Sequence, residues 1–257
     1  MKLSIIIPAY NEEGRIRPTL DAYTAYFAAR YGNEVELIVV VNNSRDRTEE
    51  MARAVAEKCP QLNVIVEPGA IGKGGAILRG FVMASGELVG FVDADNATSP
   101  EAFNELVKHI GDAGAIIASR YIPGANVSPR QPLSRRVASR FFNTLVRLLF
   151  GLPISDTQCG AKLLRGDAMR AALPHLGLTR WAFDVDLLFQ LRRLGYRIVE
   201  VPTTWQEPGG SKLRIVRTSF EMFMAICRLR MLYSPLRWVV TVYDATLGRM
   251  IHLKDST

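Results

Sequence analysis

The chain has 257 residues, enough for one large α/β domain or for one domain with an extension. No run of about 18 uncharged apolar residues is present, so we expect no transmembrane helix. Because Met1 leads directly into an apolar run at 3–7, we expect no signal peptide. The three widely spaced cysteines fit a reducing compartment rather than a disulfide framework.

The net charge of +7 conceals a strong asymmetry between the two halves. Residues 1–119 hold 11 Lys and Arg against 16 Asp and Glu, a net of −5, whereas residues 120–257 hold 21 against 9, a net of +12. A basic half indicates an anionic partner, such as phosphates, an acidic membrane surface or nucleic acid, unless it is simply a solvated surface. No basic helix carries interleaved aromatic residues, so we expect no nucleic-acid partner.

Short apolar runs alternate with helical patterns through the first half of the chain. We predict strands at 3–7, 35–41, 63–66, 87–92 and 115–118, and helices at 12–30, 46–57, 73–84 and 100–110. This alternation is typical of βαβ units, so we expect an α/β fold with a mostly parallel sheet and helices on both faces. Ligands of such sheets bind at the carboxyl ends of the strands, where polar residues follow several of these runs.

The second half is less regular. We predict a loop at 123–132 that could act as a mobile flap, a helix at 134–150 capped by Ser134, a strand at 162–165, a helix at 183–194, a strand at 197–202 and a glycine-rich loop at 207–212. Two amphipathic helices follow, with a break near Ser234-Pro235. We therefore divide the chain into a catalytic domain, 1–214, and a C-terminal helical extension, 215–257.

Asp93 and Asp95 directly follow a buried apolar run and are two residues apart. This spacing lets both carboxylates face one Mg²⁺ or Mn²⁺ ion that keeps positions open for phosphates. An isolated pair of this kind is more often a solvated turn, so the interpretation depends on the surrounding motifs.

Two further loops have phosphate- or nucleotide-binding character. Gly72-Lys73-Gly74-Gly75-Ala76 opens a helix, where free N–H groups and Lys73 attract phosphate, although tight helix packing would use the same glycines. In the loop from Pro8 to Glu12, Tyr10 could flank a base, and Glu12 could bind a ribose hydroxyl or cap the first helix.

These motifs together resemble the inverting GT-A glycosyltransferases of family 2, over about residues 3–220. The first half carries Pro8-Ala9-Tyr10-Asn11-Glu12, the Asn-Ser-x-Asp-x-Thr turn at 43–48, the glycine-rich run at 72–80, and Asp93-Ala94-Asp95. The second half is similar to the polyprenyl-phosphate branch, especially the dolichyl-phosphate glucose and mannose synthases. It carries Ser119-Arg120-Tyr121, Asp156-Thr157-Gln158-Cys159-Gly160, Phe183-Asp184-Val185-Asp186, Gly195-Tyr196, Glu200-Val201-Pro202, Trp205 and Gly210-Ser211-Lys212.

The resemblance implies a GT-A fold, with a nucleotide-sugar bound over the strand ends and Mg²⁺ or Mn²⁺ held by Asp95 with Asp93 nearby. The implied nucleotide-binding residues are Pro8, Ala9, Tyr10, Glu12, Asn42, Lys73, Asp93 and Ala94. The implied acceptor is a polyprenyl or dolichyl phosphate, and the candidate cations for it are Arg120, Arg135, Arg136, Lys212 and Arg214. The catalytic set is then Asp93, Asp95, Arg120, Asp156, Asp184 and Lys212, in which Asp156 and Asp184 orient sugar hydroxyls or arginines, or act as a base toward a hydroxyl acceptor.

Two positions depart from the family pattern. The turn that commonly reads Asp-Gly-Ser is Asn42-Asn43-Ser44, and the Gly-Phe that commonly follows Gln158 is Gly160-Ala161, a change that could alter acceptor or sugar packing. An amide at Asn42 can pair with the N3–H of uracil and a neighbouring carbonyl, whereas guanine suits a carboxylate. We therefore expect UDP-glucose as donor. The alternatives are a GDP-mannose-dependent synthase, or a soluble transferase with a hydroxyl or small phosphorylated acceptor.

The tail from 220 to 243 mixes large apolar residues with arginines. Such helices suit an acidic membrane surface, so we expect a peripheral enzyme at the cytoplasmic face of the membrane. Packing on the domain, or in the interface of a homo-oligomer, is the alternative.

Overall fold

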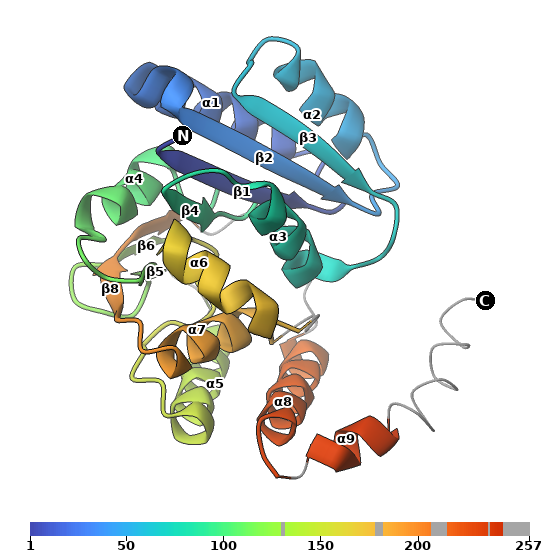
Figure 1. The fold of residues 1–257 in the computed structure, drawn as a ribbon, viewed down its shortest axis with the longest axis vertical. Coiled ribbons are helices and arrows are strands. Elements are labelled where there is room, and N and C mark those ends of the chain that lie inside the picture. Colours follow the sequence, from blue (N-terminus) through green and yellow to red (C-terminus); the bar gives the residue numbers. More distant parts are fainter. Residues whose placement is uncertain (130–131, 178–181, 207–214, 236, 244–257) are drawn as a thin grey trace.

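The computed structural model describes residues 1–129, 132–177, 182–206, 215–235 and 237–243. Its centre is a seven-stranded sheet in the order β3-β2-β1-β4-β7-β5-β8. Figure 1 shows β3, β2, β1 and β4 side by side. The strands are β1 (Leu3–Ala9), β2 (Val35–Asn42), β3 (Leu62–Glu67), β4 (Leu88–Phe91), β5 (Ala115–Ser119), β7 (Lys162–Arg165) and β8 (Ile198–Pro202). The predicted α/β fold with a mostly parallel sheet is confirmed.

One strand runs against the others. β7 pairs antiparallel with β4 on one side and with β5 on the other, while all remaining pairs in the sheet are parallel. The amino end of β7 therefore lies at the same edge of the sheet as the carboxyl ends of the parallel strands. A second, two-stranded sheet joins β6 (Asn126–Ser128) to β9 (Thr204–Gln206).

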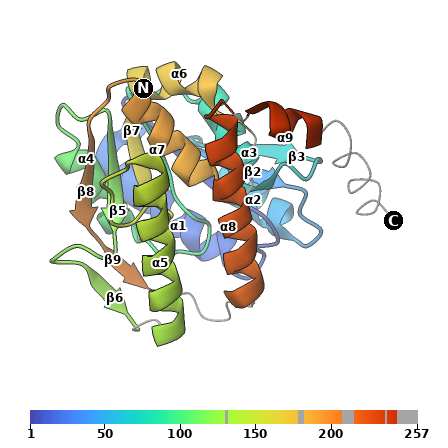
Figure 2. The same cartoon turned by 90° about the horizontal axis from the view of Figure 1, so that it is seen from below.

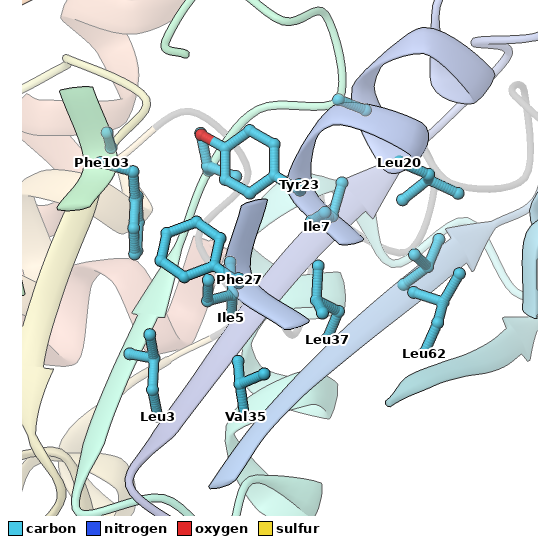
Figure 3. Close-up of a cluster of buried hydrophobic side chains, with 14 of the residues drawn as sticks. Leu3, Ile5, Ile7, Leu20, Tyr23, Phe27, Val35, Leu37, Leu62 and Phe103 are labelled. Carbon is cyan, nitrogen blue, oxygen red and sulfur yellow. The ribbon is translucent and has the colours of Figure 1, made fainter. Parts of the chain in front are cut away.

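Helices cover both faces of the large sheet. They are α1 (Ile16–Tyr31), α2 (Thr48–Ala56), α3 (Gly72–Met83), α4 (Pro100–His109), α5 (Leu133–Phe150), α6 (Gly166–Ala172), α7 (Phe183–Arg193), α8 (Ile215–Leu232) and α9 (Arg237–Tyr243). Side chains of α1, α2 and α4 pack on one face, where Tyr23 and Phe27 of α1 meet Phe103 of α4 (Figure 3), whose ring lies over Gly90 of β4. Those of α3, α6 and α7 pack on the other face. Because both faces are covered, the strands are continuous apolar runs rather than alternating ones.

A third buried cluster ties the C-terminal helices to the rest of the molecule. α5 and α8 lie side by side next to α7 (Figure 2), and Ile226 and Leu229 of α8 are buried against Val146 of α5 and Leu188 of α7. The inner face of α8 is thus part of a core that it shares with residues 142–188. No helix in the described ranges is both long and apolar enough to cross a membrane.

Several local expectations are corrected by the structure. α1 begins at Ile16 rather than residue 12, because the amides of Glu12 and Glu13 are bound by Thr48 and Asp46 and hold this segment as a loop. The N-cap of α5 is Pro132, so Ser134 lies inside the first turn and caps nothing.

The three short elements β6, β9 and α6 were not predicted at all. The predicted loop at 123–132 contains β6, whose partner β9 is far away in the sequence. α6 has only seven residues, too few for a helical period to be recognised.

Candidate active site

The carboxyl ends of β1, β2 and β4 open into a cleft of about 550 Å³, beside the N-terminus of α3. This is where the strand order reverses, the position at which α/β sheets bind ligands. All eight residues predicted to bind the nucleotide line this cleft, and so does Asp95. The lining consists of Pro8, Ala9, Tyr10, Glu12, Asn42, Asn43, Ala70, Gly72, Lys73, Ala76, Asp93, Ala94 and Asp95.

The loops after β1 and β2 are locked together by hydrogen bonds. The Asn11 amide donates to Ser44 Oγ at 3.1 Å, and the Arg45 amide donates to Asn11 Oδ1 at 2.8 Å. Asn43, at the position where the family commonly has glycine, has a φ of 49°, a left-handed conformation that asparagine tolerates better than other side chains. The departure from Asp-Gly-Ser therefore preserves the backbone of the turn.

Asn42 is nearly buried, and its Oδ1 accepts a hydrogen bond of 3.2 Å from the amide of Ile71. The oxygen that we expected to read uracil N3–H is thus partly used by the protein itself. One lone pair of this oxygen and the NH₂ group are left for a ligand.

Tyr10 and Glu12 lie at the rim of the cleft. The Tyr10 ring is 54% exposed and free to flank a base. Glu12 does not cap α1, because its carboxylate binds Arg15 through two hydrogen bonds of 2.7 and 2.8 Å. Burial raises the pKa of Glu12, and the Arg15 charge offsets this effect only in part.

Lys73 and Asp93 form an ion pair on the cleft wall, with 2.5 Å between Nζ and Oδ1. Burial alone would raise the pKa of Asp93, but the Lys73 ammonium holds it below its usual range. Burial would likewise lower the pKa of Lys73, but the Asp93 charge and then that of Asp184 raise it. Both groups are therefore charged at neutral pH.

Asp95 is held differently. Its Oδ1 accepts the Ala97 amide at 3.1 Å, and among the described residues it has no ion-pair partner. Burial and the neighbouring Asp93 charge raise the pKa of Asp95. A cation bound to this carboxylate would act against both effects and favour the ionised form of Asp95.

The chemistry of these donors fits a magnesium or manganese ion. Within the described ranges no three His, Cys, Asp or Glu side chains come close enough to hold a metal by themselves, and the carboxylates that this part of the chain brings to the cleft for a metal are Asp95 and Asp93. Mg²⁺ commonly takes one or two protein carboxylates and completes its shell with water and substrate phosphates.

A second group of charges lies at the end of β5. Arg120 donates to both carboxylate oxygens of Asp156, at 2.7 and 2.9 Å, and Glu200 accepts the backbone amides of residues 155 and 156. The guanidinium lies over the rings of Tyr121 and Trp205. Burial opposes the charge on Asp156, but the Arg120 guanidinium holds its pKa below the usual range. The pair is thus a fixed, buried unit.

Two buried hydroxyl groups flank this arginine without a hydrogen-bond partner in the described part of the chain, Ser119 Oγ and Tyr121 OH. Leaving buried polar groups unpaired is costly, so such groups often mark a place where a ligand binds.

Sequence reasoning missed Lys162 in this region. Its ammonium binds Asp184 Oδ1 at 2.6 Å and the Cys159 carbonyl at 2.7 Å, and the side chain is only 1% exposed. The one available signal was a lysine directly before the apolar pair Leu163-Leu164 in a short predicted strand. Asp184, in the first turn of α7, is 15% exposed.

The remaining predicted residues are less closely tied to the cleft. Arg135 and Arg136 are half-buried in the first turn of α5, and Lys212 and Arg214 lie outside the described residues. Ala161 is fully buried in the core over β5 and β7, so its departure from the family phenylalanine changes core packing rather than a ligand surface.

This sheet and cleft define a glycosyltransferase domain of the GT-A type. The chain belongs to glycosyl transferase family 2, whose sequence profile matches residues 4–172. The resemblance inferred from the motifs is thereby confirmed at the level of the family.

Similar proteins include several named for one activity. A dolichyl-phosphate beta-glucosyltransferase of Trichomonas vaginalis is 36% identical over 223 residues, covering 82% of this chain and 66% of that protein. Proteins of the same name from Dictyostelium discoideum and Saccharomyces cerevisiae are 32% and 30% identical over 250 residues each, which cover 93% and 90% of this chain and 76% and 75% of theirs.

Solved structures with the same fold are more distant in sequence. Glucosyl-3-phosphoglycerate synthase from Mycobacterium tuberculosis, in complex with Mn²⁺, UDP and glucosyl-3-phosphoglycerate, has a TM-score of 0.64 at 20% identity, covering 88% of this chain and 78% of its own. The likeness establishes the fold of this chain.

Proposed function

We propose that the protein transfers glucose from UDP-glucose to a dolichyl-type polyprenyl phosphate at the cytoplasmic surface of a membrane. The observation that carries this proposal is the cleft at the ends of β1, β2 and β4, where Lys73, Asp93 and Asp95 meet a nucleotide-sized space. The names of the relatives support glucose as the sugar and dolichyl phosphate as the acceptor.

In this proposal the base and ribose lie between the loops after β1 and β2, near Tyr10 and Asn42. Asp95, with Asp93, would hold a divalent ion that neutralises the diphosphate leaving group. Lys73 stands at the N-terminus of α3, whose free amides favour phosphate, and adds a second positive charge beside that group.

The acceptor chemistry needs no strong general base. A lipid phosphate is already ionised at neutral pH, so it needs to be held in line with the anomeric carbon. Arg120, fixed by Asp156, and the unpaired hydroxyls of Ser119 and Tyr121 offer donors for that phosphate. Arg135 and Arg136 remain candidates for the same role, as do Lys212 and Arg214.

A membrane surface is supported by the outer faces of the helices beside this region. Leu133, Val137 and Phe141 form an exposed stripe at spacings of four on α5, and Phe220 and Met224 are exposed on the neighbouring α8. The basic charge of this half of the chain suits anionic lipids.

The test is a transfer assay with labelled UDP-glucose and GDP-mannose, each offered polyprenyl phosphate or 3-phosphoglycerate in the presence of Mn²⁺. We expect lipid-linked glucose. Label on 3-phosphoglycerate alone would favour a small phosphorylated acceptor, and lipid-linked mannose would favour the GDP-mannose alternative. Asp95→Ala should lose turnover while its melting temperature is retained, and full activity of this variant in EDTA would contradict the metal assignment.

A further inference from the structure

Lys162 is a charged side chain in the centre of the sheet. It opens β7, faces Phe91 of β4 and Ile117 of β5 in the strand register, and is 1% exposed. Lysine is rarely buried so completely unless its charge is compensated. Here the ammonium binds Asp184 Oδ1 and the Cys159 carbonyl, and lies 5.3 Å from the centre of the Phe91 ring. It is therefore fixed on three sides.

Asp184 is held by this lysine through one oxygen only. Among the described residues its other oxygen, Oδ2, has no hydrogen-bond or ion-pair partner. The carboxylate sits in the first turn of α7, and that turn packs directly against the first turn of α3. A Cβ on Gly74 would lie 2.6 Å from the Cβ of Phe183, so the residues next to Lys73 and Asp184 are in contact. Asp184 is thus placed beside the cleft wall that carries Lys73.

A free carboxylate oxygen at this place repels the phosphates of both the donor and the acceptor. The ligand group that it can accept from is a neutral donor, and the transferred sugar supplies hydroxyl groups of this kind. We propose that Lys162 is a positioning residue, which holds Asp184 so that Oδ2 accepts one hydroxyl group of the transferred sugar. This inference rests on the proposed function, because it takes a nucleotide-sugar as the donor.

The pair could instead be purely structural, and a cycle of variants separates the two roles. Lys162→Met removes the charge while keeping the length of the chain, Asp184→Asn removes the other charge, and the double variant leaves no unpaired charge behind. Lys108→Met is the matched control, because Lys108 pairs with Glu105 on the exposed face of α4. For each protein we would measure the melting temperature and, by calorimetry with Mn²⁺, the affinities for UDP, UDP-glucose and its monodeoxy analogues.

We expect the native protein to lose about tenfold in affinity when one particular hydroxyl is missing, as for a hydrogen bond to a charged group. Lys162→Met and the double variant should bind UDP-glucose and this deoxy analogue with equal affinity, while their affinity for UDP changes less than about threefold. The double variant should regain the melting temperature that Lys162→Met loses, but it should still not distinguish UDP-glucose from the deoxy analogue. Lys108→Met should behave as the native protein does.

Two results would overturn the inference. In the first, every variant loses as much affinity for the deoxy analogue as the native protein does. In the second, the double variant regains both its melting temperature and the native loss of affinity for that analogue. If Lys162→Met does not fold, the double variant and Asp184→Asn carry the test. Because these measurements need no acceptor, a failure of lipid transfer would count against the proposed function alone. If the native protein binds UDP but binds UDP-glucose and all its deoxy analogues with the same affinity, that result would count only against the role inferred for Lys162 and Asp184.

Discussion

Gly160 lies directly against the carboxylate of Asp93. A Cβ at this position would stand 2.5 Å from Asp93 Cγ and closer still to Oδ2, so an added methyl group must push the carboxylate away from Lys73. We expect Gly160→Ala to keep its fold and to lose at least about tenfold in affinity for UDP with Mn²⁺, as for one disrupted charge-assisted contact.

Gly14→Ala is the control for this change, because a Cβ there meets nothing within 4 Å. Titration calorimetry on both variants decides the question. Equal affinities for UDP in the native protein and in Gly160→Ala would show that the position of Asp93 is unimportant for the nucleotide.

Asp156 links the fold to pH through its lowered pKa. Since the folded protein holds this carboxylate ionised below the ordinary pKa of 3.8, its stabilising effect is fully present above that value and is lost as the pH falls toward the lower folded pKa. Asp156→Asn should lower the free energy of unfolding by about 3–5 kcal/mol near neutral pH, because Arg120 is left buried without its partner.

Denaturant unfolding of both proteins from pH 7 to pH 3 measures this difference. The difference in the free energy of unfolding should be constant near neutral pH and should shrink below pH 3.8. Asp167→Asn removes only an exposed charge that pairs with Arg165, and the asparagine keeps an oxygen for the Ala168 amide, so it should show little change throughout. A difference that stays constant down to pH 3 would contradict the assigned role of Asp156.

At the scale of elements, α7 joins the active-site region to the C-terminal helices. Asp184 and Asp186 are two residues apart on it, and Asp186 Oδ1 accepts a 2.7 Å hydrogen bond from the Tyr233 hydroxyl at the end of α8. Burial raises the pKa of Asp186, so this carboxylate depends on its few donors. Tyr233→Phe should therefore destabilise the protein by about 1–3 kcal/mol.

Thermal or denaturant unfolding checks this value, with Tyr26→Phe as the control. The Tyr26 hydroxyl is engaged only by a long, exposed contact with Arg30, so its loss should have little effect. If both substitutions lower the free energy of unfolding equally, the hydrogen bond between Tyr233 and Asp186 makes no specific contribution to stability.

The elements that could be predicted from the sequence are those whose pattern is local. β1, β2 and β5 are strands of at least five residues that are largely apolar and buried on both faces, and the buried residues of α1 recur at a helical period. β6 and α6 could not be found, because a three-residue strand depends on a distant partner and a seven-residue helix is shorter than the period needed to detect it.

In the active site, too, the features that depend on local sequence could be predicted, and those that depend on distant contacts could not. The loops that line the cleft follow predicted strands, so the sequence was sufficient to bring Pro8, Asn42, Lys73 and Asp93 to one edge. Which cation pairs with Asp93, Asp156 or Asp184 was not predictable. The contact between Lys162 and Asp184 depends on β7 entering the sheet in reverse between β4 and β5.

At the scale of the whole molecule, the exposed stripe on α5 should determine membrane binding. Replacing Val137 and Phe141 by serine removes two apolar side chains that would be buried in lipid, each worth about 1.5–3 kcal/mol. Sedimentation with anionic vesicles should fall by more than tenfold, and high salt should weaken binding of the native protein.

The control makes the same replacement at Val82 and Met83, which are exposed at the end of α3 on another helix. Equal loss of vesicle binding in both double variants would argue against a specific lipid-facing surface on α5. No binding of the native protein at low salt would argue against the peripheral-membrane proposal itself.

The reversed strand β7 also has a consequence for the order in which the chain folds. β1, β2 and β3 pair among residues 3–67, whereas β4 keeps one edge unpaired until Lys162–Arg165 becomes available. Closing the longer loop costs more chain entropy, so the N-terminal block should become protected first during refolding. Pulse-labelling hydrogen exchange would detect this as early protection of amides in β1 and β2 and late protection in β7, while simultaneous protection would indicate a single concerted step. Because Asp93 follows β4 and Lys162 opens β7, the two sides of the active site would meet only in the last stage of folding.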